Sequence, residues 1–394
     1  MKSILVNFPM NIRKMLILLL LWGLQPVSAA TLEKVAGWQW LSWKASEATE
    51  SMQEIAKKAP LAGVGVDSKG RIYVSVPRWL DSRVPATLNR IVTIKGKKVL
   101  EPYPTAEMND LSDIGALQNV LGFYIDSKQR MWVLDMGHVA GRDETPDGAQ
   151  KIVVIDMRTG KTLRRFNISD QLSDRKKGFL NDISVDAEHD MAYISDSGIQ
   201  SAPDNQTAII VYDYKHNRAR RVLANHPSTK NNPDVKLMVA GEPVFKDKPF
   251  QVGINGITVS ADGKYVYWSK TTGLEFHRIN TLVLNDFSSS AEQISAAVER
   301  LGQFGGNSDG ILAGINGDIF ITDLSNSRVV RYHPASKKFT TLVKDEHLVW
   351  PDSLDWGQSN SLYLTVNHLH HAFAGVIDYS SGIDNYEIWK IKLD

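Results

Sequence analysis

The chain has 394 residues, of which 43% are hydrophobic and 23% charged, a composition typical of a globular protein and not of a disordered, collagenous or coiled-coil chain. Its 45 Lys and Arg residues balance 44 Asp and Glu residues, so we expect neither a nucleic acid nor an anionic membrane surface as a partner. The absence of cysteine excludes disulfides, thiolate metal sites and a cysteine nucleophile.

Residues 1–29 are typical of a secretory signal peptide. Basic residues precede the apolar run Met15–Leu24, and the small residues of Val27–Ala29 stand where a signal peptidase cuts. A ten-residue helix would span only about 15 Å, which is half of a bilayer core. The sequence therefore predicts an exported protein that is secreted or periplasmic, and the lack of cysteine favours a bacterial periplasm. An N-terminal helix of a cytosolic protein is the alternative.

One hairpin pattern recurs six times along the rest of the chain. Its second strand has the form apolar, aromatic, apolar, polar, and it follows another apolar run and a turn rich in Asp, Gly, Ser or Asn. The six second strands are Arg71–Val76, Arg130–Asp135, Met191–Asp196, Tyr265–Lys270, Asp318–Asp323 and Ser361–Val366. Most copies are followed by a third alternating run, such as Lys151–Asp156. Successive strands of this kind form the blade of a propeller.

These repeats predict an all-β fold over residues 30–394, a six-bladed β-propeller with four antiparallel strands per blade and small helical insertions. A repeat of roughly 60 residues exceeds the 40 to 50 residues of short propeller repeats, so the surplus is expected in loops. A two-layer sandwich is the alternative, but it does not explain six copies of one hairpin.

Two segments and one pair of strands complete the predicted elements. Ala45–Lys58 and Ser290–Leu301 have helical spacing of apolar residues, and Ser289-x-x-Glu292 is a candidate capping box for the second helix. The last run, Tyr386–Leu393, needs a partner strand. We expect Val35–Trp43 to supply it, so that the two ends of the chain close the ring.

In each blade, the chain leads into the inner strand 12 and 11 positions before the central aromatic residue. Blades one and two have apolar residues there, whereas blades three to six have an amide or a carboxylate. The polar residues are Asn181, Asp182, Asn255, Asp309 and Asp352. Oxygen atoms that converge on one axis suit a hard cation or a polar ligand. Because Asn and Asp beside Gly are common turn and cap residues, a structural role is the alternative.

The loops that leave the second strands add candidates at the same end of the propeller. Arg78, Trp79, Asn367 and His368 join the channel residues as candidates for ligand binding, with packing as the alternative for Trp79. His368 and His370 would lie on one side of an extended segment, but no third ligand has the spacing that would complete a zinc site. The sequence contains no nucleophile elbow, phosphate-binding loop or dinucleotide-binding glycine motif.

Several motifs resemble those of the Yellow and major royal jelly protein family. Pro77–Trp79 (PRW) followed by Val84–Leu88 (VPATL) is similar to the first blade of insect members, and Arg130–Gly137 (RMWVLDMG) and Leu362–Leu369 (LYLTVNHL) match further segments. The resemblance covers nearly the whole mature chain and implies a secreted six-bladed propeller with a ligand channel on one face. Some relatives are associated with dopachrome conversion and others bind biogenic amines. The lack of cysteine departs from the insect members and favours a bacterial branch.

A weaker resemblance is to the gluconolactonase and regucalcin propellers. The runs NGITVSADGK and SDGILAGINGD, which begin at Asn255 and Ser308, look like segments of that family in which an Asn and an Asp hold a divalent ion and the Asp is also the general base. Asn255 and Asp309 match these two residues. The family adds a Glu from blade one, where this chain has Leu61 and Ala62. Calcium is therefore the one cofactor that the sequence leaves open, and no residue is assigned as a metal ligand.

The residues and the resemblances support three functional hypotheses. In the first, a monomeric secreted propeller binds a small polar or aromatic-amine ligand and isomerises a dopachrome-like quinone. Asp309 or Asp352 would be the catalytic base, and Asn181 and Asn255 would hold the oxygen atoms of the substrate. The second hypothesis is a metal-dependent lactonase, and the third is a binding protein without turnover. In all three the partner is a small molecule.

Overall fold

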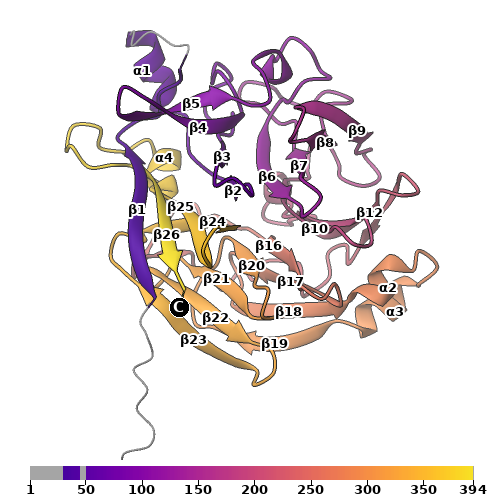
Figure 1. The fold of residues 1–394 in the computed structure, drawn as a ribbon. Helices are drawn as coiled ribbons and strands as arrows, with labels where there is room; N and C mark the ends of the chain where they lie inside the picture. Colours follow the sequence, from indigo (N-terminus) through magenta and orange to yellow (C-terminus); the bar gives the residue numbers. More distant parts are fainter. Residues whose placement is uncertain (1–29, 45–49, 394) are drawn as a thin grey trace, which may run out of the picture.

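The computed structural model describes residues 30–44 and 50–393. The predicted signal peptide, residues 1–29, and the first part of the first predicted helix, residues 45–49, lie outside the described residues. The described chain forms six four-stranded antiparallel sheets and one two-stranded hairpin. The sheets are arranged in a ring (Figure 1), so the fold is the six-bladed β-propeller that the repeats predict.

Five blades consist of four consecutive strands each, ordered from the channel outward. Blade one contains β2 (Val64–Val66), β3 (Ile72–Ser75), β4 (Leu88–Ile94) and β5 (Lys97–Pro102), and blade two contains β6 (Val120–Ile125), β7 (Arg130–Asp135), β8 (Lys151–Asp156) and β9 (Lys161–Asn167). Blade three contains β10 (Leu180–Asp186), β11 (Met191–Asp196), β12 (Ala208–Asp213) and β13 (Arg218–Val222), and blade four contains β16 (Ile254–Val259), β17 (Tyr265–Lys270), β18 (Glu275–Asn280) and β19 (Glu299–Gln303). Blade five contains β20 (Ile311–Ala313), β21 (Ile319–Asp323), β22 (Arg328–His333) and β23 (Lys338–Lys344). A small hairpin, β14 (Met238–Val239) and β15 (Glu242–Pro243), connects blades three and four.

Blade six joins the two ends of the chain. Its three C-terminal strands are β24 (Trp350–Gly357), β25 (Ser361–Asn367) and β26 (Tyr386–Lys392), and its outer strand is β1 (Thr31–Trp38). Strand β1 runs antiparallel to β26, and the two lie side by side in Figure 1. This confirms the predicted closure of the ring, although the partner strand begins four residues before the predicted Val35–Trp43.

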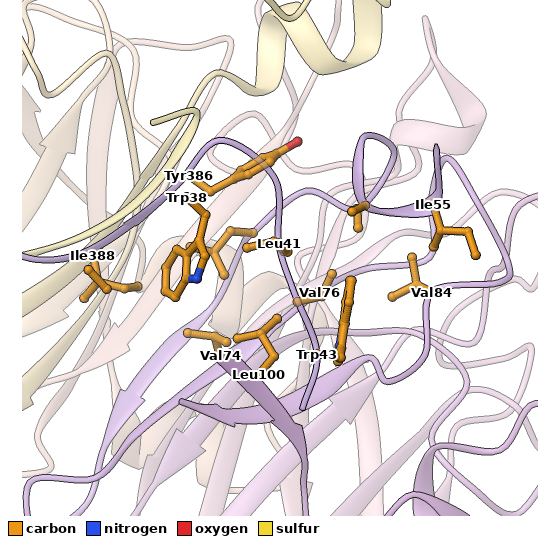
Figure 2. Packing of buried hydrophobic residues seen from close by; sticks show 14 of the residues in the cluster. Trp38, Leu41, Trp43, Ile55, Val74, Val76, Val84, Leu100, Tyr386 and Ile388 are labelled. Carbon is orange, nitrogen blue, oxygen red and sulfur yellow. The ribbon is translucent and has the colours of Figure 1, made fainter. Parts of the chain in front are cut away.

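The segment after β1 belongs to the core between blades six and one (Figure 2). Leu41 and Trp43 are buried there against Val74 and Leu100 of blade one. The indole of Trp43 donates a hydrogen bond of 3.1 Å to Asn89 Oδ1, which holds it in blade one. This packing explains why strand β1 ends at Trp38 and does not continue to Trp43, as predicted.

The described helices are short and lie outside the sheets. They are α1 (Glu50–Ala56), α2 (Thr281–Asn285), α3 (Ala291–Ala296) and α4 (Leu369–Ala374), with two 3₁₀ turns at Glu107–Asn109 and Ile199–Ser201. Helix α3 is capped by Ser290 and Gln293, one residue beyond the predicted Ser289 and Glu292. It ends before the predicted Leu301 because that segment forms the outer strand β19. No helix of the described ranges has the length and apolar character needed to span a bilayer.

Candidate functional site

The inner strands of four blades are interrupted at the same level, near one end of the channel. In each of these strands the pairing register shifts, and two residues leave the ladder. The displaced pairs are Leu121 and Gly122, Asn181 and Asp182, Asn255 and Gly256, and Asp352 and Ser353. Because a β-bulge redirects side chains, it allows the polar residues of different blades to meet.

The five polar residues predicted at the channel do lie together. They line one narrow pocket with Leu121, Gly122, Gly310 and Ser353. We name the set Asn181, Asp182, Asn255, Asp309 and Asp352 the channel floor. Glycine is required beside it, because a Cβ atom on Gly310 would lie 2.3 Å from the carbonyl oxygen of Asp352.

Asp309 is the most strongly hydrogen-bonded carboxylate of the channel floor. Trp350 Nε1 donates to Asp309 Oδ2 at 2.6 Å, and Asn255 Nδ2 donates to Asp309 Oδ1 at 2.5 Å. Asn255 Nδ2 also lies 2.8 Å from Thr271 Oγ1, which fixes the orientation of the amide. Burial raises the pKa of Asp309, whereas the two N–H donors act to lower it. Trp350 is thus buried in the core and also donates a hydrogen bond to the channel floor.

Asp352 lies beside Asp309 and titrates together with it. Burial raises the pKa of Asp352 well above its usual range, and the charge of Asp309 raises it further. Asn367 Nδ2 lies 3.4 Å from Asp352 Oδ2 and donates at 2.9 Å to the carbonyl oxygen of Leu61. Asn367 therefore links Asp352 to the backbone of blade one. The two carboxyls therefore form a coupled pair in which burial and mutual repulsion disfavour the doubly ionised state.

Asp182 connects blades three and four. Its Oδ1 accepts a hydrogen bond of 2.8 Å from its neighbour Ile183 N, and its Oδ2 accepts one of 3.3 Å from Ile257 N. Burial raises the pKa of Asp182 to about 7. Ser195 Oγ accepts from Asp182 N and donates to the carbonyl oxygen of Asn255, so one hydroxyl fixes floor residues of two blades.

Besides Trp350, four aromatic side chains line the pocket above the channel floor. They are Trp79, Phe179, Phe250 and Phe373, and they come from four different blades or connections. We name them the aromatic collar. The ring centroids of Trp79 lie 6.0 Å from Phe179 and 5.9 Å from Phe373, and Phe373 lies 5.8 Å from Phe250. Trp79 was predicted as a candidate, whereas the three phenylalanines were missed.

The collar closes over the floor. The pocket that the collar and the floor line together has a volume of about 40 Å³, far below the roughly 300 to 1,000 Å³ of typical small-molecule pockets. All four collar residues lie in connecting segments or in α4, so their rings can move aside for a ligand without disturbing the inner strands.

Arg78 is not among the residues that line the pocket. Its guanidinium is buried and donates to the backbone carbonyl oxygens of Val84, Pro85, Asn109, Leu117 and Gln118. Burial lowers the pKa of Arg78 to about 10. The PRW motif is therefore physically coupled to the VPATL motif, because the arginine of the first holds the loop of the second.

His368 lies at the start of α4 and likewise does not line the pocket. Its ring centroid is 5.6 Å from that of His371 and 6.3 Å from that of His370. His370 in turn stacks on Trp350 at 5.8 Å. Within the described residues no group of three or more His, Asp and Glu side chains has the geometry of a metal site.

The oxygen atoms of the channel floor are not arranged to coordinate a divalent cation. Both oxygens of Asp309 accept N–H donors, and those of Asp182 accept backbone N–H groups. Calcium prefers six to eight oxygen ligands with carboxylates free to coordinate. Blade one offers no acid, because Leu61 and Ala62 stand at its corresponding positions.

The sequence model of a family described as major royal jelly protein matches residues 118–394, more than half of the chain. The chain belongs to this family. It is 24% identical to major royal jelly protein 3 of Apis mellifera over 222 residues, which are 54% of this chain and 38% of that protein. It is 22% identical to a Yellow-related salivary protein of Phlebotomus argentipes over 220 residues, which are 54% of this chain and 53% of that protein. The chain thus spans about half the length, or less, of these curated relatives.

Solved structures share the architecture at low sequence identity. A regucalcin from Agrobacterium tumefaciens, titled a calcium-binding protein, has a TM-score of 0.52 at 12% identity and covers 85% of this chain and 92% of its own. A gluconolactonase from Xanthomonas campestris has a TM-score of 0.51 at 11% identity, with 93% and 91% covered. A luciferin-regenerating enzyme also has a TM-score of 0.51, at 13% identity, with 93% and 96% covered. Likeness at this identity establishes the propeller fold alone.

Proposed function

We propose that the protein binds a small aromatic amine in the channel, with the ring against the aromatic collar and the ammonium group on the channel floor. The observation that carries this proposal is the buried carboxylate of Asp309, which lies beneath aromatic rings and has no cationic side chain in the lining of its pocket. A buried carboxylate is costly without a counter-charge, and an ammonium ligand supplies one.

The channel floor suits the ammonium group of such a ligand, and the aromatic collar suits its ring. An ammonium group would donate hydrogen bonds to Asp309 and Asn181, and it would stabilise the ionised form of the pair that Asp309 makes with Asp352. The collar would stack on the ring, and aromatic faces also attract cations. Binding would require rings of the collar to turn outward.

The proposal is tested by measuring the affinity for dopamine by calorimetry, with 4-methylcatechol as a probe that has the same ring without the ammonium group. We expect dopamine to bind more tightly. Asn255→Ala and Asp309→Ala should weaken dopamine binding by about 10- to 150-fold, the value of one hydrogen bond to a charged group. Asn217→Ala and Asp262→Ala, in turns away from the channel floor, are the controls. Equal affinity for the two probes, or unchanged affinity in the first pair, would place the site elsewhere.

A tautomerase activity on a dopachrome-like quinone is the second candidate. The coupled carboxyl pair favours it, because an ionised Asp309 could remove a proton from a carbon next to the carbonyl while a protonated Asp352 delivers one to the carbonyl oxygen. The proton taken and the proton given balance. The loss of dopachrome absorbance is the assay. Asp309→Asn and Asp352→Asn should each abolish the enzymatic rate, and Asp352→Asn should still bind dopamine. If the unchanged protein converts dopachrome no faster than the uncatalysed reaction, the protein binds its ligand without turnover.

We also propose that the protein is exported and acts as a monomer. The support is the signal-peptide pattern of residues 1–29 and the closed ring, in which β1 covers the edge of β26. Mass spectrometry of the mature protein from a periplasmic fraction, together with light scattering, tests both statements. An N-terminus that still includes Met1 would contradict export by this route.

A further inference from the structure

A second cavity lies beside the aromatic collar, at the hairpin that connects blades three and four. Its volume is about 620 Å³, within the range of small-molecule pockets. Its walls include the apolar side chains of Leu237, Val244, Phe245 and Phe250. We name it the hairpin cavity. It is distinct from the channel, and Phe250 alone lines both.

The two sides of the hairpin cavity are fixed to different parts of the propeller. On one side the hairpin is tied to blade five, because Met238 N donates to Asn307 Oδ1 at 2.9 Å and Ala240 N donates to the carbonyl oxygen of Leu324 at 2.9 Å. On the other side Phe250 packs against Phe373 of α4. A hollow whose walls are held independently does not close by local collapse, so the cavity is preformed for an occupant.

The backbone of the wall is strained where it presents its largest side chain. Phe245 has φ of +54°, in the left-handed region that bulky residues rarely adopt. Its ring centroid lies 5.3 Å from that of Phe250, so the two rings form one apolar surface. Strain of this kind persists where the surrounding structure enforces it, and it clusters at sites that clamp ligands.

The rim of the cavity carries positive charge. Lys236 and Lys246 are exposed residues that line it, and within the described part of the chain neither forms an ion pair. Asp234 is the one acidic residue of the lining, so the rim has a net positive charge. An apolar hollow with two cationic side chains at its edge is complementary to a molecule with an apolar body and one anionic end.

We propose that the hairpin cavity binds an amphipathic anion, a carboxylate on an alkyl chain. The alkyl chain of the ligand would lie on Leu237, Val244 and Phe245. Its carboxylate would form ion pairs with the ammonium groups of Lys236 and Lys246. This proposal is independent of the function proposed for the channel, because it uses neither the floor carboxylates nor a cationic ligand.

The experiment measures binding of decanoate to the mature protein by calorimetry, below the concentration at which decanoate forms micelles. Decyltrimethylammonium, with the same chain length and the opposite charge, is the ligand control. The double variant K236E/K246E should weaken decanoate binding at least tenfold. The matched double variant K230E/K248E changes the same charge in the same connection at residues that do not line the cavity, and it should bind decanoate as the unchanged protein does.

A second variant tests the apolar wall without depending on the lysines. Phe245→Gly fits the left-handed backbone, so the protein should still fold, and because the variant lacks the ring that packs on Phe250 it should lose affinity for decanoate. Equal binding of the two detergents, or decanoate affinity that K236E/K246E leaves unchanged, would overturn the proposal.

Discussion

The substitution Asp182→Asn tests whether the carboxylate of Asp182 serves ligand binding or the stability of the fold. Burial raises the pKa of Asp182 to about 7, against about 3.9 for an Asp in an unfolded chain. As the pH rises between these values, the unfolded chain releases this proton while the folded protein still holds it. The free energy of unfolding therefore decreases through this window, by up to about 1.4 kcal/mol per pH unit, and the loss is complete above pH of about 7.

The magnitude follows from the two pKa values. A difference of about three units corresponds to a cost on the order of 4 kcal/mol at alkaline pH, of which roughly 2 to 3 kcal/mol develops between pH 5 and pH 8. An asparagine does not titrate, and its Oδ1 can still accept one of the two backbone hydrogen bonds, from Ile183 N or from Ile257 N, that the carboxylate accepts. We therefore expect Asp182→Asn to be more stable than the unchanged protein at pH 8, with a gain that is about 2 to 3 kcal/mol smaller at pH 5.

Urea denaturation at the two pH values measures this difference, with Asp247→Asn on the exposed part of the hairpin connection as the control. A gain in stability at pH 8 accompanied by loss of dopamine binding would show that the carboxylate is retained at a cost to stability because the ligand needs it. A variant that is less stable at both pH values would refute the reasoning, since Asp182 would then serve chiefly to hold the Ile257 N–H group.

Three further predictions concern the closure, the bonds between blades and the metal. Deletion of residues 30–44 should lower the melting temperature of the whole domain, because it exposes the edge of β26 and removes Trp38 and Trp43 from the core; melting at the full-length temperature would contradict the closure. Ser195→Ala should cost about 1 to 3 kcal/mol in urea denaturation and also weaken dopamine binding, since its hydroxyl fixes Asp182 and Asn255. Calcium at about 1 mM should leave the melting temperature unchanged; micromolar affinity that is lost in Asp309→Asn would establish the lactonase-type site instead.

The fold could be predicted because its information is local and repeated. Each second strand needs apolar residues on both faces, since it lies between neighbouring blades, and its aromatic residue recurs for the same reason. The six predicted second strands agree with β3, β7, β11, β17, β21 and β25 within one residue at each end. The channel floor could be predicted because each of its residues stands 12 or 11 positions before the central aromatic residue of its blade.

The collar could not be predicted because the loops between blades follow no period. Phe179 and Phe250 each precede an inner strand, but at different distances, and Phe373 lies in α4, a segment expected to be a loop. Nothing in the spacing of these phenylalanines brings them together. Trp350 does stand at a repeated position, yet its bond to Asp309 depends on the rotation of one indole, which only the packing of the side chains determines.

The asymmetry of the ring explains how one end of a propeller can hold an oriented ligand. In blade one, Leu61 and Ala62 are buried, and their carbonyl oxygens accept bonds from Asn367 and Thr365 of blade six, so these positions lock the closure of the ring. Blade two contributes the apolar Leu121, and the carboxyls and amides of the floor come from blades three to six. A ligand with one polar end has a single favourable orientation in such a pocket, because turning it around would bury its polar group against Leu121 and leave the carboxyls unpaired.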